Sequence, residues 1–431
     1  MIRVLAVSDL HVTAGKREAD QVSALARILE DARALRPSLV LLGGDFYGHT
    51  VPHRSSPHER EILAPWVQAL SDLAPVLVLY GNHDYPEDLE ILGRLGGLWP
   101  VRVVTEPEIV RMDTAQGPVD VAALPYPKKR AWVAAEEARS PDELNRVFSG
   151  KLRELLDVWG LVLRQQRAEV SAVVLAAHVQ VSGSRTGGGE VLIGGEPELS
   201  RQAIADLPID VGILGHIHLP QEAGRRTWYA GSPWPQDFGE LHDAGYLVAD
   251  VGTIHPPPLA VPLGRIRPAS IYTEERDARA VSIHRVLTGA APLVSLTWRW
   301  GVPHGSEVAA WLERPSSEEI QDAAGSHVRA RLHVQPQARA SLPWEAEIAA
   351  VKASAASWTE EIQVETSISV RAPEVSAAET TADKLRAYWR TLKPAPAEEL
   401  QAGALVALED LETGGAGAAL ARISELRTEV G

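Results

Sequence analysis

The chain has 431 residues, and at roughly 100 to 200 residues per domain this length predicts two or three domains. Its apolar content of 45% and charged content of 23% are typical of a folded globular protein and exclude a disordered or fibrous one. It has no cysteine, so any metal must be bound by His, Asp, Asn or Glu. A net charge of −15 argues against binding nucleic acid through bulk basicity, so a DNA substrate would have to be attracted by local patches, metals or a partner.

No apolar stretch approaches the roughly 18 residues that a membrane-spanning helix needs. The first strand-like run, Ile2–Val7, leads directly into a candidate site residue instead of a cleavage site. We therefore expect neither a signal peptide nor a membrane anchor, and we place the protein in the cytoplasm.

From residue 1 to about residue 268, short apolar runs alternate with helical patterns, which predicts an α/β domain. Between the first two runs, apolar residues recur at intervals of three and four and predict a helix with one stripe facing the core, namely Val22, Leu25, Leu29 and Ala32. Buried strands are predicted at residues 3–7, 39–42, 76–80, 172–176 and 211–214. Each is followed by Asp, Asn, His or Gly, and open α/β sheets bind their ligands at that edge.

Prolines at positions 256–258, 262 and 268 interrupt regular structure and predict the end of the first domain near residue 268. Residues 269–326 show no clear pattern and are taken as a connecting region. Residues 327–375 predict a small α/β module, with strands at 328–334 and 361–370 around a helix at 345–356. Residues 376–431 predict C-terminal helices, the first with an apolar stripe formed by Leu385, Tyr388, Trp389 and Leu392.

Potential metal ligands follow five predicted strands. Asp9 and His11 stand two residues apart, and alternate side chains of an extended segment point the same way. Alone, this pair could equally be a capping Asp beside a surface His. The other strand ends carry Gly44-Asp45, Gly81-Asn82-His83-Asp84, His178 and Gly215-His216-Ile217-His218. These nitrogen and oxygen donors suit manganese, iron or zinc, and a bridged pair of such ions predicts phosphoester hydrolysis.

In this order, the five segments resemble the motifs of calcineurin-like metallophosphoesterases. The resemblance implies a four-layer αββα sandwich, with Asp45 bridging two divalent metal ions. One ion would be bound by Asp9, His11, Asp45 and His218, and the other by Asp45, Asn82, His178 and His216. It further implies that His83 is a catalytic residue that steadies the scissile phosphate or protonates the leaving oxygen, with Asp84 orienting it.

Further segments resemble the nuclease branch represented in the SbcCD exonucleases: residues 124–127, 193–195, 229–233 and 237–240. This resemblance implies a manganese-dependent nuclease that processes DNA ends and hairpins with an SbcC-type, SMC-like ATPase, and that forms a homodimer. It also implies that residues 327–375 form a capping domain that docks DNA, and that the helices in 376–431 bind the ATPase. Where some relatives carry a second catalytic histidine this chain has Gly48, so the role of the following His49 is left open.

Two other functions remain open. A small-molecule phosphodiesterase or phosphatase on the same fold is favoured by the negative net charge, because its substrate needs no extended basic surface. A structural adaptor with a purely stabilising metal site is disfavoured by the presence of His83 beside a full ligand set. Lys128, Lys129 and Arg130 could contact a DNA phosphate or form a solvated surface. The chain has no P-loop, so any ATP dependence must come from a partner.

Overall fold

The structure is a computed structural model. It describes residues 1–15, 17–48, 54–95, 97–133, 140–187, 198–240, 242–275, 278–304, 306–365, 378, 380–392 and 398–414. Within these ranges, no helix combines the length and the apolar character that crossing a membrane requires.

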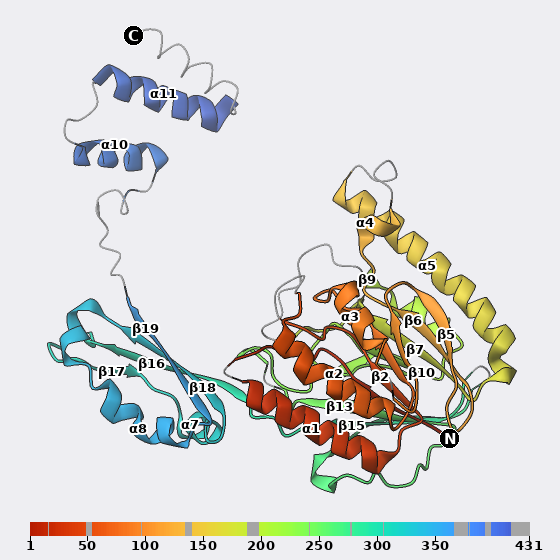
Figure 1. Ribbon diagram of the computed structural model, residues 1–431. Coiled ribbons are helices and arrows are strands. Elements are labelled where there is room, and N and C mark those ends of the chain that lie inside the picture. Colours follow the sequence, from red (N-terminus) through yellow and green to blue (C-terminus); the bar gives the residue numbers. More distant parts are fainter. Residues whose placement is uncertain are drawn as a thin grey trace. The chain divides into compact units, whose positions relative to one another are not determined.

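The first sheet has seven strands, four of which run parallel from the centre to one edge (Figure 1). The other three continue the sheet on the far side of the first strand in antiparallel pairs. The strand order is β14 (Ile266–Tyr272), β15 (Val281–Leu287), β13 (Gly245–Val251), β1 (Ile2–Val7), β2 (Leu39–Leu42), β3 (Val76–Leu79) and β4 (Val101–Val104).

The second sheet has six strands, and its four central strands run parallel. The order is β11 (Gln221–Gly224), β12 (Thr227–Tyr229), β10 (Val211–Gly215), β7 (Ala172–His178), β6 (Val119–Leu124) and β5 (Glu108–Met112). A short parallel pair, β8 (Gln180–Val181) and β9 (Glu198–Leu199), stands apart from both sheets.

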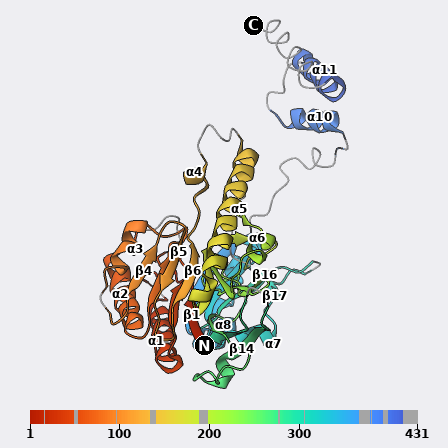
Figure 2. The same ribbon diagram turned by 90° about the vertical axis from the view of Figure 1, so that its right-hand side faces the viewer.

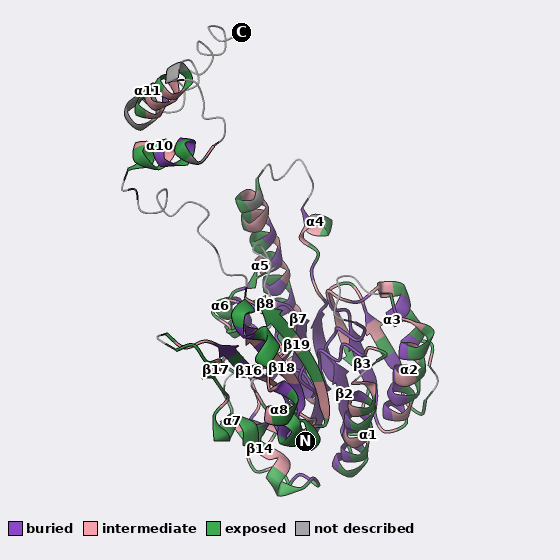
Figure 3. Cartoon of the chain, turned by 90° about the vertical axis from the view of Figure 1, so that its left-hand side faces the viewer, coloured by how far each residue is buried: buried purple, intermediate pink, exposed green. Residues whose placement is uncertain are grey.

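Three apolar clusters define four layers (Figures 2 and 3). One cluster packs the first sheet against α1 (Glu18–Leu35), α2 (Pro57–Ser71) and α3 (Pro86–Leu92). The second joins the two sheets, and the third packs the second sheet against α5 (Pro141–Gln166) and α6 (Arg201–Ala205), with α4 (Lys129–Trp132) contributing Trp132. Strand β1 serves two layers by alternation, since Ile2, Val4 and Ala6 face the second sheet while Leu5 and Val7 face the helices. The predicted αββα sandwich is confirmed.

The helix predicted after the first strand is α1, but its buried stripe was wrong at one position. Leu25 and Ala32 are buried as predicted, and Leu29 is partly buried. Val22, however, is 43% exposed, and Ala24 and Ile28 occupy the core instead. The core-facing stripe is therefore rotated relative to the prediction.

The sheet of the first domain does not stop at the proline cluster. Residue 268 lies within β14, and the sheet continues through β15 to Leu287. The segment 269–326 also contains β16 (Leu293–Gly301), β17 (Ala310–Glu313) and α7 (Ser317–Asp322). Single turns of 3-10 helix occur at η1 (Arg167–Glu169) and η2 (Leu263–Arg265), and a longer one at η3 (Pro336–Ser341).

A four-stranded sheet follows, in the order β17, β16, β18 (His327–Val334) and β19 (Ser357–Val364). The helix α8 (Trp344–Ser354) connects β18 to β19 in the sequence. On β18, Val328, Ala330, Leu332 and Val334 alternate into the core. Trp298 of β16 meets Trp344 of α8 edge to face, with ring centroids 5.4 Å apart. The strand, helix and strand predicted after residue 327 are present, although residues 366–370 of the predicted last strand lie outside the described residues.

Two C-terminal helices are described, α10 (Thr381–Thr391) and α11 (Glu398–Gly414). Thr380 caps α10, because its side chain accepts a hydrogen bond from the backbone N–H of Asp383. Trp389 of the predicted stripe is buried, whereas Tyr388 is 49% exposed. By its contacts the chain divides into one unit of Met1–Arg299, Trp311–Leu332 and Leu342–Ile362, and a second of Trp300–Ala310, His333–Ser341 and Gln363–Gly431.

Candidate metal centre

The predicted site residues lie at the carboxyl ends of strands from both sheets. β1, β2 and β3 supply Asp9 and His11, Asp45, and the segment 81–84 from the first sheet. β7 and β10 supply His178 and the segment 215–218 from the second sheet. The two sheets meet at this edge, where the His178 Nε2 atom lies 3.1 Å from the Asp45 Oδ2 atom. Five separate stretches of sequence thereby converge on one place.

Backbone conformation at these strand ends is unusual. Asp9, His11, Asp45 and His216 have φ angles of 55°, 44°, 55° and 90°, in the left-handed region that side chains other than glycine seldom adopt. Backbone hydrogen bonds between the two strand ends hold Asp9, His11 and Asp45 in place. The N–H group of Asp9 donates to the Gly44 carbonyl oxygen at 3.0 Å, and that of His11 donates to the Asp45 carbonyl oxygen at 2.9 Å. Such outliers are held in place by their surroundings and are concentrated at functional sites.

Glycines at two of the strand ends permit the close approach of the imidazole of His178. A Cβ atom at Gly44, whose φ is 101°, would collide with the Nδ1 atom of His178. A Cβ atom at Gly215 would lie 2.8 Å from that same Nδ1 atom. A side chain at either position would push the imidazole away from the site.

The first predicted ligand set forms a compact group. Asp9, His11 and His218 each offer a donor atom within 4.8 Å of the others. The Nε2 atom of His11 lies 3.6 Å from the Asp45 Oδ2 atom, so the proposed bridging carboxylate borders this group as well.

The second predicted set is connected through a side-chain amide. The Oδ1 atom of Asn82 lies 3.0 Å from the His178 Nε2 atom and 2.9 Å from the His216 Nδ1 atom. The Asp45 carboxylate also borders His178, and an amide and a carboxylate oxygen facing two imidazoles form a donor set suited to a borderline divalent ion.

Polar atoms left without partners fit bound cations. Among the described residues, the buried Oδ2 atom of Asp9 and the buried Nε2 atom of His216 have no hydrogen-bond partner. Leaving a buried carboxylate oxygen without a partner is costly unless a cation compensates. Burial raises the pKa of Asp9, so its ionised form needs a compensating positive charge nearby. Burial and the neighbouring His178 lower the pKa of His216 to about 3, which keeps its imidazole neutral, the form that binds metals.

Hydrogen bonds behind the imidazoles fix their orientation. The Nδ1 atom of His178 lies 2.7 Å from the Gly43 carbonyl oxygen, and that of His11 contacts the Gly48 carbonyl oxygen. The Nδ1 atom of His218 lies 2.7 Å from the Glu240 Oε1 atom. Carboxylate and carbonyl acceptors of this kind orient metal-binding histidines. Glu240 was not recognised from the sequence as part of the site, although it ends the run 237–240 that resembles the nuclease branch.

The expected pairing of His83 with Asp84 is wrong. The Asp84 carboxylate accepts hydrogen bonds from the backbone N–H groups of Asp45, Phe46 and Gly81 at 2.9, 2.8 and 3.1 Å. The buried Nδ1 atom of His83 has no hydrogen-bond partner among the described residues. Asp84 therefore holds the turn that carries Asp45 and does not orient the His83 ring.

His83 itself lies within the cluster. Its backbone N–H donates to the Asp45 Oδ1 atom at 2.8 Å, and its ring centroid lies 4.7 Å from that of His11. It offers a ring nitrogen within 4.8 Å of donor atoms of His11 and Asp45, so the geometry admits either a ligand or a catalytic role. His49 and residues 193–195 lie outside the described residues.

Comparison with known proteins agrees with this geometry. A model of the calcineurin-like phosphoesterase family matches residues 2–220. The chain belongs to this family. It is therefore a phosphoester hydrolase of a family that uses divalent metals, and the match spans all the candidate ligands.

This phosphoesterase is also similar to the SbcD component of the nuclease SbcCD from Bacillus subtilis (strain 168), with 26% identity over 337 residues that cover 72% of this chain and 75% of that protein. The predicted resemblance to the nuclease branch is confirmed as a similarity. The structure is also similar to the crystal structure of the calcineurin-like phosphoesterase YfkN from Bacillus subtilis. The match covers 67% of this chain and 90% of the YfkN chain, with 11% identity and a TM-score of 0.34.

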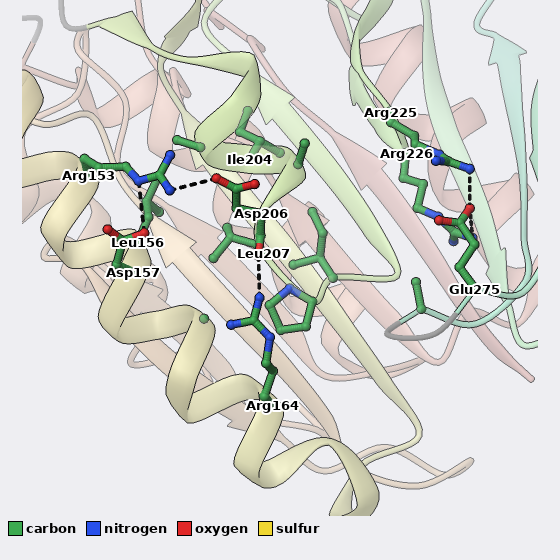
Figure 4. A pocket seen from close by; sticks show the side chains of 16 residues that line it. Arg153, Leu156, Asp157, Arg164, Ile204, Asp206, Leu207, Arg225, Arg226 and Glu275 are labelled. Carbon is green, nitrogen blue, oxygen red and sulfur yellow. Dashed lines mark hydrogen bonds and ion pairs between the residues drawn. The ribbon is translucent and has the colours of Figure 1, made fainter.

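A cavity of about 600 Å³ is lined by charged side chains of α5 and of residues 206, 225, 226 and 275 (Figure 4). It is bordered by α5 and by residues 203–209, which precede β10, whereas the candidate ligands His216 and His218 follow β10, so the cavity and the metal centre lie at opposite ends of this strand. Its charged groups pair with one another: Arg153 contacts the Asp206 carboxylate at 2.7 Å and Arg225 contacts Glu275 at 2.5 Å. The chemistry of the phosphoesterase is therefore assigned to the strand ends and not to this cavity.

Proposed function

We propose that this phosphoesterase hydrolyses DNA phosphodiesters with two manganese ions. The observation that carries the proposal is the convergence of seven donor side chains from five strand ends, in a chain similar to a nuclease component over 72% of its length. Histidine nitrogens mixed with carboxylate and amide oxygens suit manganese. The seven residues are Asp9, His11, Asp45, Asn82, His178, His216 and His218.

The two ions divide these ligands. One ion would be held by Asp9, His11, Asp45 and His218, and the other by Asp45, Asn82, His178 and His216, with Asp45 common to both sets. When bound, such ions polarise a phosphoryl oxygen and lower the pKa of a bound water.

The remaining residues position these groups and handle the proton. His83 steadies the phosphate or protonates the leaving oxygen, as its place beside His11 and Asp45 allows. Asp84 holds the backbone of Asp45, and Glu240 orients His218.

The last third of the chain supplies contacts to macromolecules. We propose that the sheet β16–β19 docks DNA, which is supported by Arg329 and Arg331 alternating with the buried residues of β18. The helices α10 and α11 bind an SbcC-type, SMC-like ATPase, which is supported by the exposed apolar residues Tyr388, Leu400 and Val406. The homodimer and the cytoplasmic location stay predictions.

A small-molecule phosphodiesterase is the second candidate. The observation that favours it is the net charge of −15, because a small diester needs no extended basic surface. It would use the same metal centre.

The full chain, purified metal-free and supplied with manganese, should be tested on a labelled DNA hairpin and on a chromogenic phosphodiester. Each substrate is tested with and without the SbcC-type partner and ATP, with the Asp45→Ala variant as the control for contaminating nucleases. Cleavage of the hairpin that increases with partner and ATP would support the DNA nuclease. Hydrolysis of the small diester alone would transfer the assignment to the small-molecule enzyme.

A further inference from the structure

A small cavity borders the metal centre. It has a volume of about 140 Å³, and Tyr126 contributes to its wall. The ring centroid of Tyr126 also lies 5.7 Å from that of His216, so this side chain borders both the cavity and the candidate ligands. Tyr80 forms another part of the wall, and its carbonyl oxygen accepts a hydrogen bond of 2.9 Å from the Tyr126 N–H. Because Tyr80 directly precedes Gly81, the cavity begins next to the segment that supplies Asn82.

The wall of this cavity consists largely of rings. Tyr80, Tyr126 and Trp132 contribute aromatic rings, and several prolines contribute flat apolar surfaces. Pockets for whole small molecules usually measure roughly 300–1,000 Å³, so this cavity is sized for one side group of a substrate. A cavity of this volume with flat apolar walls suits a single planar ring.

Polar side chains also line this cavity, among them Thr105, Glu106 and Lys128. Tyr80 is 2% exposed, and its buried hydroxyl has no hydrogen-bond partner among the described residues. Buried hydroxyls normally find a partner, so a ligand that supplies one would be favoured. The Lys128 Nζ atom, on an exposed side chain, lies 4.8 Å from the centroid of the Tyr80 ring. The cavity is therefore complementary to a planar ring that carries hydrogen-bonding groups on its edge.

We propose that Tyr80, Tyr126, Trp132 and Lys128 form a subsite that binds the nucleobase of the nucleotide next to the scissile phosphate. The inference rests on the proposed phosphodiester hydrolysis and names the part of the substrate that the site recognises. It gives a function to residues 124–128, which the metal centre leaves without one. Stacking on aromatic side chains is sequence-tolerant, so this subsite selects for the presence of a base and not for its identity.

The subsite has a consequence for the form of the substrate. A base held between these rings cannot be stacked in a duplex, and unstacking is least costly when the base is already unpaired. The nucleotide at the scissile position is therefore expected to be single-stranded.

The test uses the full chain with manganese and three dinucleotides. One is thymidylyl-thymidine, and in each of the other two one base is replaced by an abasic tetrahydrofuran. Loss of one particular base should lower kcat/KM roughly 5- to 150-fold, the range measured when base stacking is removed. Trp132→Ala, which removes a ring, and Tyr80→Phe, which removes only the hydroxyl, should each reduce this discrimination. Trp99→Ala, a matched change just before β4 at the end of the sheet opposite the metal centre, should preserve it.

Three results would overturn the subsite: equal hydrolysis of all three dinucleotides, discrimination that both variants retain in full, and no hydrolysis of the dinucleotide with both bases. Failure of the proposed nuclease looks different. Discrimination among dinucleotides without cleavage of hairpin DNA would leave the subsite in place and refute the DNA nuclease. Cleavage of hairpin DNA with equal hydrolysis of the three dinucleotides would support the DNA nuclease and refute the subsite.

Discussion

Replacing Asp84 with Asn tests how the turn after β2 holds the proposed bridging ligand. The Asp84 carboxylate is 1% exposed, and it accepts three backbone N–H bonds, two at Oδ2 from Asp45 and Gly81 and one at Oδ1 from Phe46. An Asn side chain has a single acceptor oxygen, so its amide group would face one of these N–H groups. An unpaired buried N–H costs roughly 1–3 kcal/mol, and the remaining bonds lose the strength that a charged acceptor confers. We expect Asp84→Asn to lower the free energy of unfolding by about 1–2 kcal/mol, because Asn loses one of these bonds but does not carry the charge that burial penalises.

Urea unfolding of the metal-free full chain measures this loss, and manganese titration measures the displacement of Asp45. Burial and then the Asp45 carboxylate raise the pKa of Asp84 to about 7, so the comparison is made at pH 8, where the carboxylate is ionised. Asp72→Asn is the matched control, because exposed Asp72 accepts a single N–H bond, from Leu98 at 3.2 Å. We expect it to change stability by less than about 0.5 kcal/mol. An Asp84→Asn protein with wild-type stability and manganese affinity would refute the structural role of Asp84.

The other predictions concern the metal centre directly. His83→Ala should retain manganese while kcat falls roughly 10²- to 10⁴-fold, as for loss of a general acid, and loss of metal in elemental analysis would make His83 a ligand instead. Asp45→Ala should lose metal and activity together, whereas two ions bound at full occupancy would refute the shared carboxylate. Glu240→Gln should weaken manganese binding roughly 10- to 100-fold through His218, and unchanged affinity would show that this hydrogen bond does not orient the imidazole. Burial alone would lower the pKa of His178, but the Asp45 carboxylate raises it to about 9. Since only a neutral imidazole binds metal, manganese binding at pH 7.5 should release a proton from His178 and should strengthen as pH rises toward 9. Calorimetry in buffers with different ionisation enthalpies detects that proton, and a heat that does not depend on the buffer would contradict the prediction.

The sequence predicted the fold and the composition of the site because both depend on local patterns. Apolar runs followed by Asp, Asn, His and Gly identify parallel strands and their carboxyl ends, and parallel strands bring those ends to one edge. The predicted pairing of Asp84 was wrong because it rested on His83 being the adjacent residue in the sequence. In the fold, Asp84 accepts hydrogen bonds from backbone N–H groups 38 and 39 residues earlier, in the turn after β2, and from that of Gly81. The contact between Glu240 and His218 spans 22 residues and depends on the folded loop.

The continuation of the first sheet past residue 268 has a physical explanation. Proline lacks an N–H group and is tolerated on edge strands and at bulges. β14 is the edge strand of the sheet, and its register shifts between Pro268 and Ser270. A proline would interrupt a central strand, but it does not interrupt β14. The sequence alone does not reveal which strand lies at the edge of the sheet.

The negative charge of the chain does not decide between DNA and a small diester. At physiological ionic strength charges are screened over roughly 8 Å, so a phosphate in the metal centre is governed by groups in its immediate surroundings. Those surroundings hold the candidate ligands, and the Lys128 ammonium lies over the ring of Tyr80, two residues before Asn82. Most of the carboxylates that make up the net charge of −15 act beyond that distance and reduce only the long-range attraction of a polyanion. Discrimination between substrates must therefore come from what surrounds the scissile phosphate, and for this reason the ring-lined cavity beside His216 is the more informative feature.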